Sequence, residues 1–462
     1  MNKKLILYEL NEVPKKVIDI FVKFNKHSAL GKILNESSYF DTFTIDEGEL
    51  HPWSTWPTFH RGVSNNIHGI KYINQDLQYS SKFPPLWEIL VENDLKVGVF
   101  GSLQSFPPIK HKNMQFYLPD TFAPNEEAFP EDLKEFQKFN LLMTNKNKAI
   151  SRNIDLQSIR SFMRFLSKNK ITLKSYLKIS SHLLKENYEP KYKKRRSLLQ
   201  PIIGFDLYFK LLKKYQPNFT TFFTNHVAGM MHRYWRDLFP EDFGLDLSDV
   251  DSFHKNSIFE SMKIADKQIQ CLKDFADKNN YSFCIASSMG QESIKRGKYI
   301  PELFINDFRL VSKALKIDPY SYEILPAMQP DICIKCKTYE ALELLRMQLP
   351  NIIDTSKNQI FIERYNPVGL YLNLSIKRSK TCSQNKKIQI LEKIYDLTEL
   401  GFELIARDQG TGYHVPEGIL IMYGDIAKKY NNLTQRSFDS RKFAPLILDY
   451  FELKRPNYMI KI

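Results

Sequence analysis

Cysteine is scarce in this sequence, and its few occurrences exclude a fold that depends on disulfides. Five cysteines in 462 residues are an odd number without clustering, which argues against a disulfide framework. Cys333 and Cys336 have C-x-x-C spacing, but they lie in an apolar alternation and no second pair completes a zinc knuckle. We therefore expect these two thiols to pack inside a strand.

Long apolar runs are also missing. The N-terminal segment has only four apolar residues, 5–8, before Glu9, which is too short for the apolar core of a signal peptide. No run approaches the roughly 20 apolar residues of a membrane-spanning helix. The sequence therefore predicts a cytoplasmic protein, and its 43% hydrophobic and 26% charged content is ordinary for a globular one.

Acidic residues are in the minority, 52 against 66 Lys and Arg, which gives a formal net charge of +14. Such an excess predicts attraction to anions such as phosphorylated or sulfated compounds, nucleic acid or an acidic membrane face. The charge alone does not choose among them. Nucleic acid is disfavoured, because no stacking motif accompanies the basic residues.

Glycine is absent between residues 129 and 200, where lysine is dense. Residues 141–200 contain 15 Lys and Arg against 3 acidic residues, and apolar residues recur at helical spacing near 159–166 and 177–183. We expect residues 129–200 to form an inserted basic helical cap. Its charge is either a solvated face or a surface that attracts an anionic partner, such as an acidic membrane.

Strand-like and helix-like patterns alternate along the rest of the chain. This predicts an α/β fold with a mostly parallel sheet flanked by helices. The expected strands are 5–10, 96–101, 219–224, 281–287, 331–336, 359–363, 368–374 and 418–423, and the main expected helices are 13–24, 258–275, 338–349, 386–398 and 444–451. Residues 1–128 and 201–462 are expected to form one core around the cap, with a small β/α subdomain near 320–400.

Polar residues follow three of the expected strands directly. In open α/β sheets, ligands bind beyond the carboxyl ends of the strands, so these residues predict one shared site. The pairs are Asn11-Glu12, Asn225-His226 and Ser288-Met289.

A segment rich in hydroxyl and imidazole groups, residues 51–70, is expected to join them. Pro52 and Pro57 disfavour a long regular helix across it. The pattern predicts an extended entry, a turn near Ser54 and Thr55, and a short helix that starts at Pro57. The free N–H groups at such a helix start suit a bound anion.

Residues 62–70 resemble the T-G-x-x-P-x-x-H-G-I segment of the type I phosphodiesterase and nucleotide pyrophosphatase branch of the alkaline phosphatase superfamily, with Arg61 for its Thr and Asn65 for its Pro. Residues 412–419 match the G-Y-H-x-P-x-G-I motif of the same branch. The resemblance implies an alkaline phosphatase-like fold and a hydrolase or transferase that acts on a phosphate ester, with a phosphodiester as the substrate type.

The resemblance also suggests a hydroxyl nucleophile, which would form a covalent intermediate. Thr55-Trp56-Pro57 fits the T-x-P turn of the family, although it lies closer to Gly62 than usual. Thr55 is therefore the first candidate, Ser54 the second and Thr58 the third.

Members of the superfamily usually bind two metal ions, and half of that arrangement is changed here. Asn11 stands where the first Asp is expected, and Ser288 and Met289 replace the Asp-His pair of an S-D-H-G motif. Met is a soft ligand and Ser a weak neutral donor. The resemblance therefore implies that one of the two metal positions has been lost.

The other half retains its histidines. Residues 225–235 resemble the D-x-x-x-H region with a longer spacing, so that His232 matches the His, and His226 or Asn225 replaces the Asp. His414 is the histidine of the G-x-H motif. These residues predict one divalent ion, with Zn²⁺ expected. Glu9 and Glu12, which flank Asn11, are either substitute ligands or solvated acids.

Three cationic side chains are candidates to bind phosphate: His60, Arg61 and Arg233. A guanidinium can hold phosphate oxygens with paired hydrogen bonds and partly replace a missing metal charge. The alternative for each is an ordinary ion pair on the surface or within the sheet.

Several short motifs, among them E-L-N-E at residues 9–12 and S-S-M-G at 287–290, resemble those of a divergent bacterial subgroup of the superfamily. Members of that subgroup often accompany surface-polysaccharide synthesis. This resemblance implies a glycan intermediate as a possible partner. The opposing hypothesis is a catalytically degenerate member that binds anions or acts as a scaffold. The changed metal positions favour it, and the intact 412–414 motif opposes it.

Overall fold

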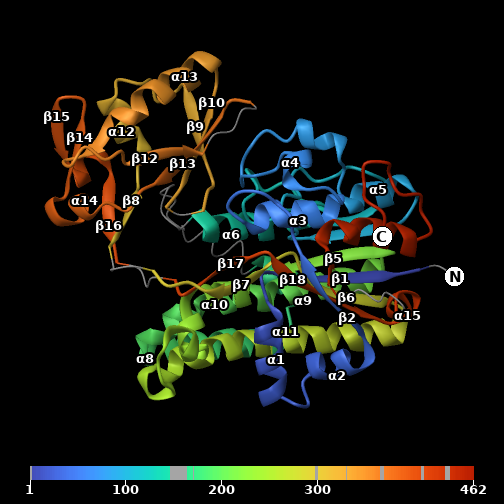
Figure 1. Cartoon of the computed structure of the whole chain (residues 1–462). Helices are drawn as coiled ribbons and strands as arrows, with labels where there is room; N and C mark the ends of the chain where they lie inside the picture. Colours follow the sequence, from blue (N-terminus) through green and yellow to red (C-terminus); the bar gives the residue numbers. More distant parts are fainter. Residues whose placement is uncertain are drawn as a thin grey trace.

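The computed structural model describes residues 3–145, 164–169, 171–296, 300–328, 330–364, 369–406, 410–431 and 437–462. A large α/β core carries a smaller domain to one side (Figure 1). Across these ranges, no helix is both long and apolar enough to cross a membrane.

The core is built on an eight-stranded sheet with the order β19-β2-β18-β6-β1-β5-β3-β4. β1 pairs in parallel with β5 and β6, and β3 pairs in parallel with β4 and β5, whereas β18 is antiparallel to β2 and β6. This confirms the α/β fold with a mostly parallel sheet. The strands are β1 Leu5–Leu10, β2 Ser38–Phe43, β3 Val97–Phe100, β4 Met114–Leu118, β5 Phe219–Thr224, β6 Ser282–Ser287, β18 Glu417–Tyr423 and β19 Ser437–Asp439.

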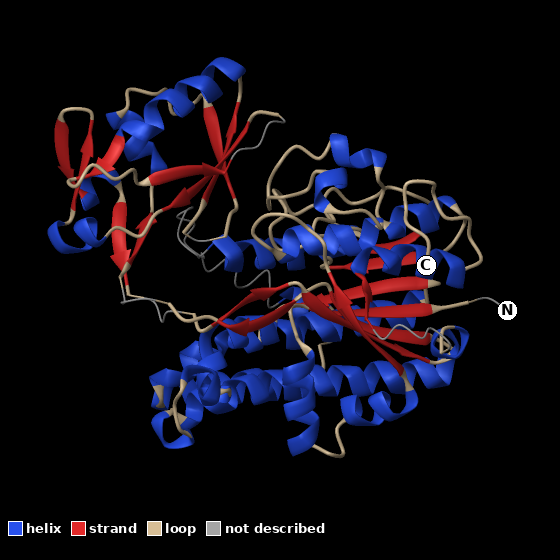
Figure 2. Ribbon diagram, viewed as in Figure 1, coloured by secondary structure: helices blue, strands red, loops and turns tan. Residues whose placement is uncertain are grey.

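Helices cover both faces of this sheet (Figure 2). The near-continuous apolar run of β1 follows from this arrangement, because a strand covered on both sides has no solvated face. One layer contains α1 Lys15–Phe24, α2 Ala29–Glu36, α9 Gln200–Tyr215, α10 His226–Leu238 and α11 Ser252–Asn279. The other contains α3 Pro52–Arg61, α4 Asn65–His68, α5 Leu86–Glu92, α15 Asp425–Lys429 and α16 Phe443–Tyr450.

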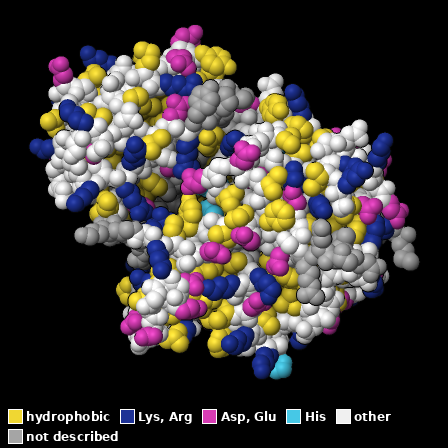
Figure 3. Space-filling view, viewed as in Figure 1, with side chains coloured by type: hydrophobic (Ala, Val, Ile, Leu, Met, Phe, Trp, Pro, Cys, Tyr) yellow, Lys and Arg dark blue, Asp and Glu magenta, His cyan; other side chains and the backbone are white. Residues whose placement is uncertain are grey.

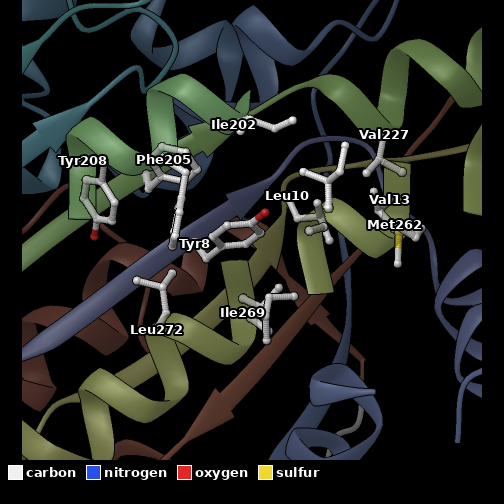
Figure 4. Packing of buried hydrophobic residues seen from close by; sticks show 14 of the residues in the cluster. Tyr8, Leu10, Val13, Ile202, Phe205, Tyr208, Val227, Met262, Ile269 and Leu272 are labelled. Atoms are coloured by element: carbon white, nitrogen blue, oxygen red, sulfur yellow. The ribbon is translucent and has the colours of Figure 1, made fainter. Parts of the chain in front are cut away.

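Alternate residues of β1 enter two separate hydrophobic clusters, as the two-residue period of a strand requires. Tyr8 and Leu10 pack against α9 and α11 (Figure 4), and the Tyr8 hydroxyl donates to Gln268 Oε1 at 2.6 Å. Leu5 and Leu7 belong to the cluster that contains Trp56 of α3. The strand is thereby fixed from both sides, and its C-terminal end is held in place.

The smaller domain has its own hydrophobic cluster, which runs from Leu303 to Phe402. Cys333 and Cys336 are buried in its strand β10, as the apolar alternation predicts. A two-stranded ladder of β7 Gly290–Ser293 and β17 Gly412–Val415 leads from the core toward this domain. Its elements are β8 Glu302–Ile305, α12 Phe308–Ala314, β9 Tyr322–Leu325, β10 Ile332–Cys336, α13 Tyr339–Gln348, β11 Ile352–Asp354, β12 Phe361–Arg364, β13 Tyr371–Ile376, α14 Lys380–Asn385, β14 Lys387–Ile390, β15 Lys393–Asp396 and β16 Phe402–Ile405.

The helix expected over 386–398 is wrong, because this segment is the hairpin of β14 and β15. Ile388 and Ile390 are buried on one side of β14, which also pairs with β11. Leu391 has a φ of 55° in the connection, which turns the chain back. Pairing with a distant strand therefore overrides the local helical spacing.

The described part of the basic insertion is helical, with α6 Lys134–Asn145, α8 Leu173–Tyr188 and the 3₁₀ helix η3 Pro190–Leu198. The helical spacing at residues 159 and 162 lies outside the described ranges. In η3, Arg195 is buried, donates to Ser257 Oγ at 2.9 Å and lies 3.8 Å from the ring centroid of Phe253. Arg196 pairs with the buried Glu186. Part of the basic run therefore holds the insertion to the core instead of facing solvent.

Candidate metal centre and active site

Three side chains from separate elements converge at the carboxyl end of β1. Glu12 follows β1, His232 lies on α10 and His414 lies on β17, and their ligand atoms are all within 4.8 Å of one another. Glu12 Oε2 is 2.9 Å from His232 Nε2 and 3.4 Å from His414 Nε2. The sequence predicts both histidines and names Glu12 as one of two possible substitute ligands, and the structure brings Glu12 to them.

The hydrogen bonds of the two imidazoles determine where their protons lie. His232 Nδ1–H donates to Gly412 O at 2.9 Å, and His414 Nδ1–H donates to Leu50 O at 2.6 Å, because a carbonyl oxygen can only accept. Both Nε2 atoms therefore face one carboxylate oxygen. A proton or a cation must lie between them, and ligating histidines in proteins commonly have this backbone-anchored form.

The geometry fits a tetrahedral zinc ion. Zn–N and Zn–O bonds of about 2.0–2.1 Å place neighbouring ligand atoms about 3.3 Å apart. The 3.4 Å distance from Glu12 Oε2 to His414 Nε2 matches that value, and the 2.9 Å distance to His232 Nε2 is shorter. Glu12 is buried, whereas the His232 side chain is 31% exposed. Three protein ligands with access to solvent leave a fourth position open, which is typical of catalytic zinc.

The charges within the cluster support each other. Burial by itself would raise the pKa of Glu12, but the His414 and His232 imidazoles outweigh it and hold that pKa well below its usual range. Burial opposes protonation of His232, yet the carboxylate raises its pKa. The cluster therefore favours an anionic carboxylate that is matched by positive charge.

Glu12 is held in an unusual backbone conformation, with a φ of 60°. Asn11 Nδ2 donates to its Oε1 at 2.8 Å, and Gln291 Nε2 donates to its Oε2. A left-handed conformation at a non-glycine residue is costly and persists only where surrounding contacts determine it. These contacts aim Oε2 at the two imidazoles.

The position that the family resemblance gives to a second metal is filled by amide hydrogen bonds. Asn11 Nδ2 donates to Asn225 Oδ1 at 2.6 Å, and Trp56 Nε1 donates to Asn11 Oδ1 at 2.8 Å. Ser288 and Met289, which directly follow β6, are both completely buried. Asn225 therefore contacts Asn11 instead of completing the set of metal ligands with His232.

His226 does not lie in the cluster. Its Nε2–H donates to Ser261 O at 3.0 Å, so its Nδ1 accepts from Thr224 Oγ1 at 2.6 Å. Burial lowers its pKa to about 4. The expected set of three histidines is corrected to Glu12, His232 and His414, because both ring nitrogens of His226 are used in the core.

Thr55 is the fourth residue of α3 and lies in its first turn. α3 begins at Pro52 and contains Pro57, so the helix start expected at Pro57 is wrong. The reason is that Ser54 and Thr55 N–H both bond to His51 O at 3.0 Å, which closes the first turn earlier. Thr55 is fully buried, and its Oγ1 lies 2.8 Å from Ser288 Oγ.

The other two candidate hydroxyls point elsewhere. Thr58 Oγ1–H donates to Asp46 Oδ1 at 2.7 Å, and Ser54 Oγ–H donates to Asp46 Oδ2 at 3.3 Å. His68 Nδ1 accepts from Ile70 N–H, so its Nε2–H donates to Thr58 Oγ1 at 2.9 Å. Of the three hydroxyls, only that of Thr55 contacts a side chain at the carboxyl end of a central strand.

Arg61 and His60, two of the residues predicted to bind phosphate, make hydrogen bonds to other parts of the protein. Arg61 is buried and donates to Ser80 O at 3.2 Å and to Phe83 O, and burial lowers its pKa to about 10. His60 Nε2 lies 2.6 Å from Glu9 Oε1, and both groups are buried. Neither side chain is part of the Glu12 cluster.

The small domain supplies a cation that the sequence did not indicate. Arg233 is exposed and donates to Lys194 O, whereas Arg364 at the end of β12 lies 3.4 Å from both His51 Nε2 and Glu49 Oε2. The His51 ring is 5.6 Å from the His414 ring. Figure 3 shows an imidazole at the surface between the small domain and the core.

Comparisons with known proteins give only weak likenesses. No family model and no curated protein matches the sequence. Murine ectonucleotide pyrophosphatase/phosphodiesterase 5 is similar with a TM-score of 0.39 and 12% identity, covering 99% of this chain and 98% of that one; one further structure is its inactive variant in complex with AMP. Phosphonoacetate hydrolase from Sinorhizobium meliloti, in complex with phosphonoformate, has a TM-score of 0.40 and 12% identity over 91% of this chain and 90% of that one. The fold assignment therefore rests on the strand order, and the site on its own geometry.

Proposed function

We propose that this chain is a metal-assisted hydrolase or transferase of phosphate esters, of the alkaline phosphatase superfamily and its type I phosphodiesterase branch. The observation that supports this proposal most directly is that His232 Nε2 and His414 Nε2 face one oxygen of Glu12. These three residues would hold a single divalent ion, with Zn²⁺ expected. When bound, such an ion would polarise a phosphoryl oxygen.

Thr55 is the proposed nucleophile. Its Oγ1 is oriented by the Ser288 hydroxyl, and α3 is tied to the metal cluster through the hydrogen bonds of Trp56 to Asn11 and of Asn11 to Glu12. This connected set would place an attacking oxygen beside the cluster. Ser54 is less suitable, because its hydroxyl is directed to Asp46.

A phosphodiester suits this site better than a monoester. With Asn11, Ser288 and Met289 in place of the ligands of the family, the second metal position offers no carboxylate or imidazole from these three residues. The substrate would therefore meet one metal ion instead of two. A diester carries a single negative charge at its phosphate and needs fewer cations than a monoester dianion. Arg364 would supply a further positive charge at the rim.

A glycan intermediate with a phosphodiester linkage is the substrate class that the subgroup resemblance favours. It would combine the anionic group that the site needs with the surface-polysaccharide association. A cytoplasmic location remains a prediction.

The competing proposal is a degenerate member that binds anions or acts as a scaffold. It is favoured by one observation, the complete burial of both Thr55 and Ser288 with their hydroxyls bonded to each other. A nucleophile must be reached by substrate, so this proposal predicts a metal site without turnover.

An assay with bis(p-nitrophenyl) phosphate and p-nitrophenyl phosphate, with Zn²⁺ or Mn²⁺ added, tests the function. We expect turnover of the diester, its loss in Thr55→Ala and its retention in the matched variant Ser54→Ala. Loss in Ser54→Ala alone would assign the other hydroxyl. Activity that survives in the double variant would exclude covalent catalysis by this pair, and a metal-loaded protein without any turnover would support the degenerate alternative.

A further inference from the structure

Helix α8 presents its large apolar side chains to solvent. Leu173, Leu177, Leu184 and Tyr188 are 72%, 62%, 58% and 85% exposed. Their spacing of four, seven and four residues places them along one side of an α-helix with 3.6 residues per turn. We call these four residues the leucine stripe.

The side of α8 that faces the protein is mixed, because Tyr176 and Ile179 are partly buried against the main hydrophobic cluster beside polar residues. Ser175 and Glu186 are buried, and Glu186 pairs with Arg196 of η3. Ser175 N–H donates to Thr172 Oγ1, which caps the helix, and Thr172 is in turn bonded to Asp206 of α9. A surface helix ordinarily buries its apolar side and exposes its polar one. In α8 the leucine stripe is a second set of apolar side chains that lies on the exposed side, while Tyr176, Ile179 and the polar contacts hold the helix in place.

Lysines run alongside the stripe. Lys174, Lys178 and Lys185 are exposed, and at roughly 100° per residue they fall on the strip of helix surface next to the leucines. We call them the lysine row. Figure 1 shows α8 at the edge of the core, on the opposite side of the sheet from α3 and α5. Apolar and cationic side chains are thus adjacent at an outer edge of the molecule.

We propose that α8 binds the surface of an anionic phospholipid bilayer. The leucine stripe would enter the boundary between headgroups and acyl chains, as amphipathic interfacial helices do, while the lysine row would contact lipid phosphates. The net charge of +14 would attract the whole molecule to such a surface. Lipid is favoured over a second copy of this basic chain, because two lysine rows would repel each other.

The η3 run is not the main lipid contact. Arg195 and Arg196 are engaged with Phe253 and Glu186, so their substitution would disturb the attachment of α8 itself. The exposed lysine row and leucine stripe are therefore the positions at which to test the surface.

Co-sedimentation of the whole protein with lipid vesicles tests this proposal without any activity measurement. We expect binding to vesicles of phosphatidylcholine with phosphatidylglycerol, little binding to phosphatidylcholine alone, and weaker binding as salt rises. Replacing the lysine row by glutamine should lower the affinity roughly 100-fold. Replacing Leu177 and Leu184 by serine should lower it at least roughly tenfold.

Matched surface variants serve as controls. Leu247→Ser removes a leucine that is 64% exposed elsewhere, and Lys313→Gln, Lys316→Gln and Lys337→Gln together remove three exposed lysines of the small domain. Both controls should bind vesicles like the wild type, and all variants should keep its thermal midpoint.

Three outcomes would overturn the proposal. The first is the absence of binding to anionic vesicles, and the second is equal loss in the control variants. The third is a concentration-dependent doubling of mass in light scattering that Leu177→Ser with Leu184→Ser abolishes, which would assign the stripe to a second copy of the chain.

Discussion

Asp46 is a half-buried carboxylate that bonds to the side chains of Ser54 and Thr58 on α3. It accepts hydrogen bonds from both hydroxyls and from Asn65 N–H. Burial nevertheless raises its pKa from 3.8 to about 6. The folded protein therefore binds this proton more tightly than the unfolded chain does.

This shift predicts a pH dependence of stability. Because the folded pKa is the higher one, the stabilising effect of protonation is complete below pH about 4 and is lost as pH rises through about 6. Over that window the contribution should change by about 2 kcal/mol. Urea unfolding of wild type and Asp46→Asn between pH 4 and 7 measures it, and the difference between the two proteins should vary with pH. A constant difference would contradict the shifted pKa.

Single residues also show where the sequence is informative about the site. His232 and His414 could be predicted because each stands in a motif. Glu12 could be named only as one of two flanking acids, because its role depends on a left-handed backbone after β1. Arg364 could not be predicted, because tertiary packing alone brings it beside His51.

At the scale of elements, the β14–β15 hairpin carries backbone strain at an exposed residue. Leu391 has a φ of 55° and is 57% exposed, and a side chain in this conformation costs about 1–2 kcal/mol. Leu391→Gly relieves that strain but increases the entropy of the unfolded chain, so the net gain in stability should be about 0.5–1 kcal/mol.

Chemical denaturation of the two hairpin variants checks this. Ile394→Gly is the matched control, since Ile394 is 54% exposed in β15 and has no left-handed conformation to relieve. It should destabilise the protein. A loss of stability in Leu391→Gly would show that the hairpin does not require the left-handed conformation.

The elements differ in how far the sequence alone could predict them. β1 and β5 consist mostly of apolar, aromatic and β-branched residues and are followed by polar pairs, and both appear where expected. Residues 386–398 contain apolar positions that fit either period, and pairing with β11 decides between them. α3 begins before Pro57, where the sequence predicts its start, because this proline is tolerated inside a helix whose first turn is closed by His51 O.

At the scale of the whole molecule, the small domain contributes to the rim of the site. Arg364 contacts Asp331 within that domain at 3.2 Å and Glu49 of the core at 3.4 Å. The guanidinium thus links the two parts of the protein beside His51. Under the proposed function, it would supply positive charge for an anionic substrate near the Glu12 cluster.

Arg364→Gln should therefore raise KM for an aryl phosphodiester about tenfold and change kcat less, because the cation contributes to binding and not to the attack itself. Arg309→Gln is the control, since Arg309 is an exposed arginine of the same domain paired with Asp307. Steady-state kinetics of the three proteins test this. An unchanged KM in Arg364→Gln would leave the residue with a role only in joining the domains.

Zinc titration of chelator-treated protein by calorimetry tests the central claim most directly. Wild type should bind one Zn²⁺, and Glu12→Gln should weaken binding by more than the ~10–100-fold that loss of an outer hydrogen-bond partner costs. His27→Ala, at an exposed histidine between α1 and α2 that is not part of the cluster, should bind like wild type. Absence of zinc binding in the wild type, or equal affinity in Glu12→Gln, would contradict a metal site formed by Glu12, His232 and His414.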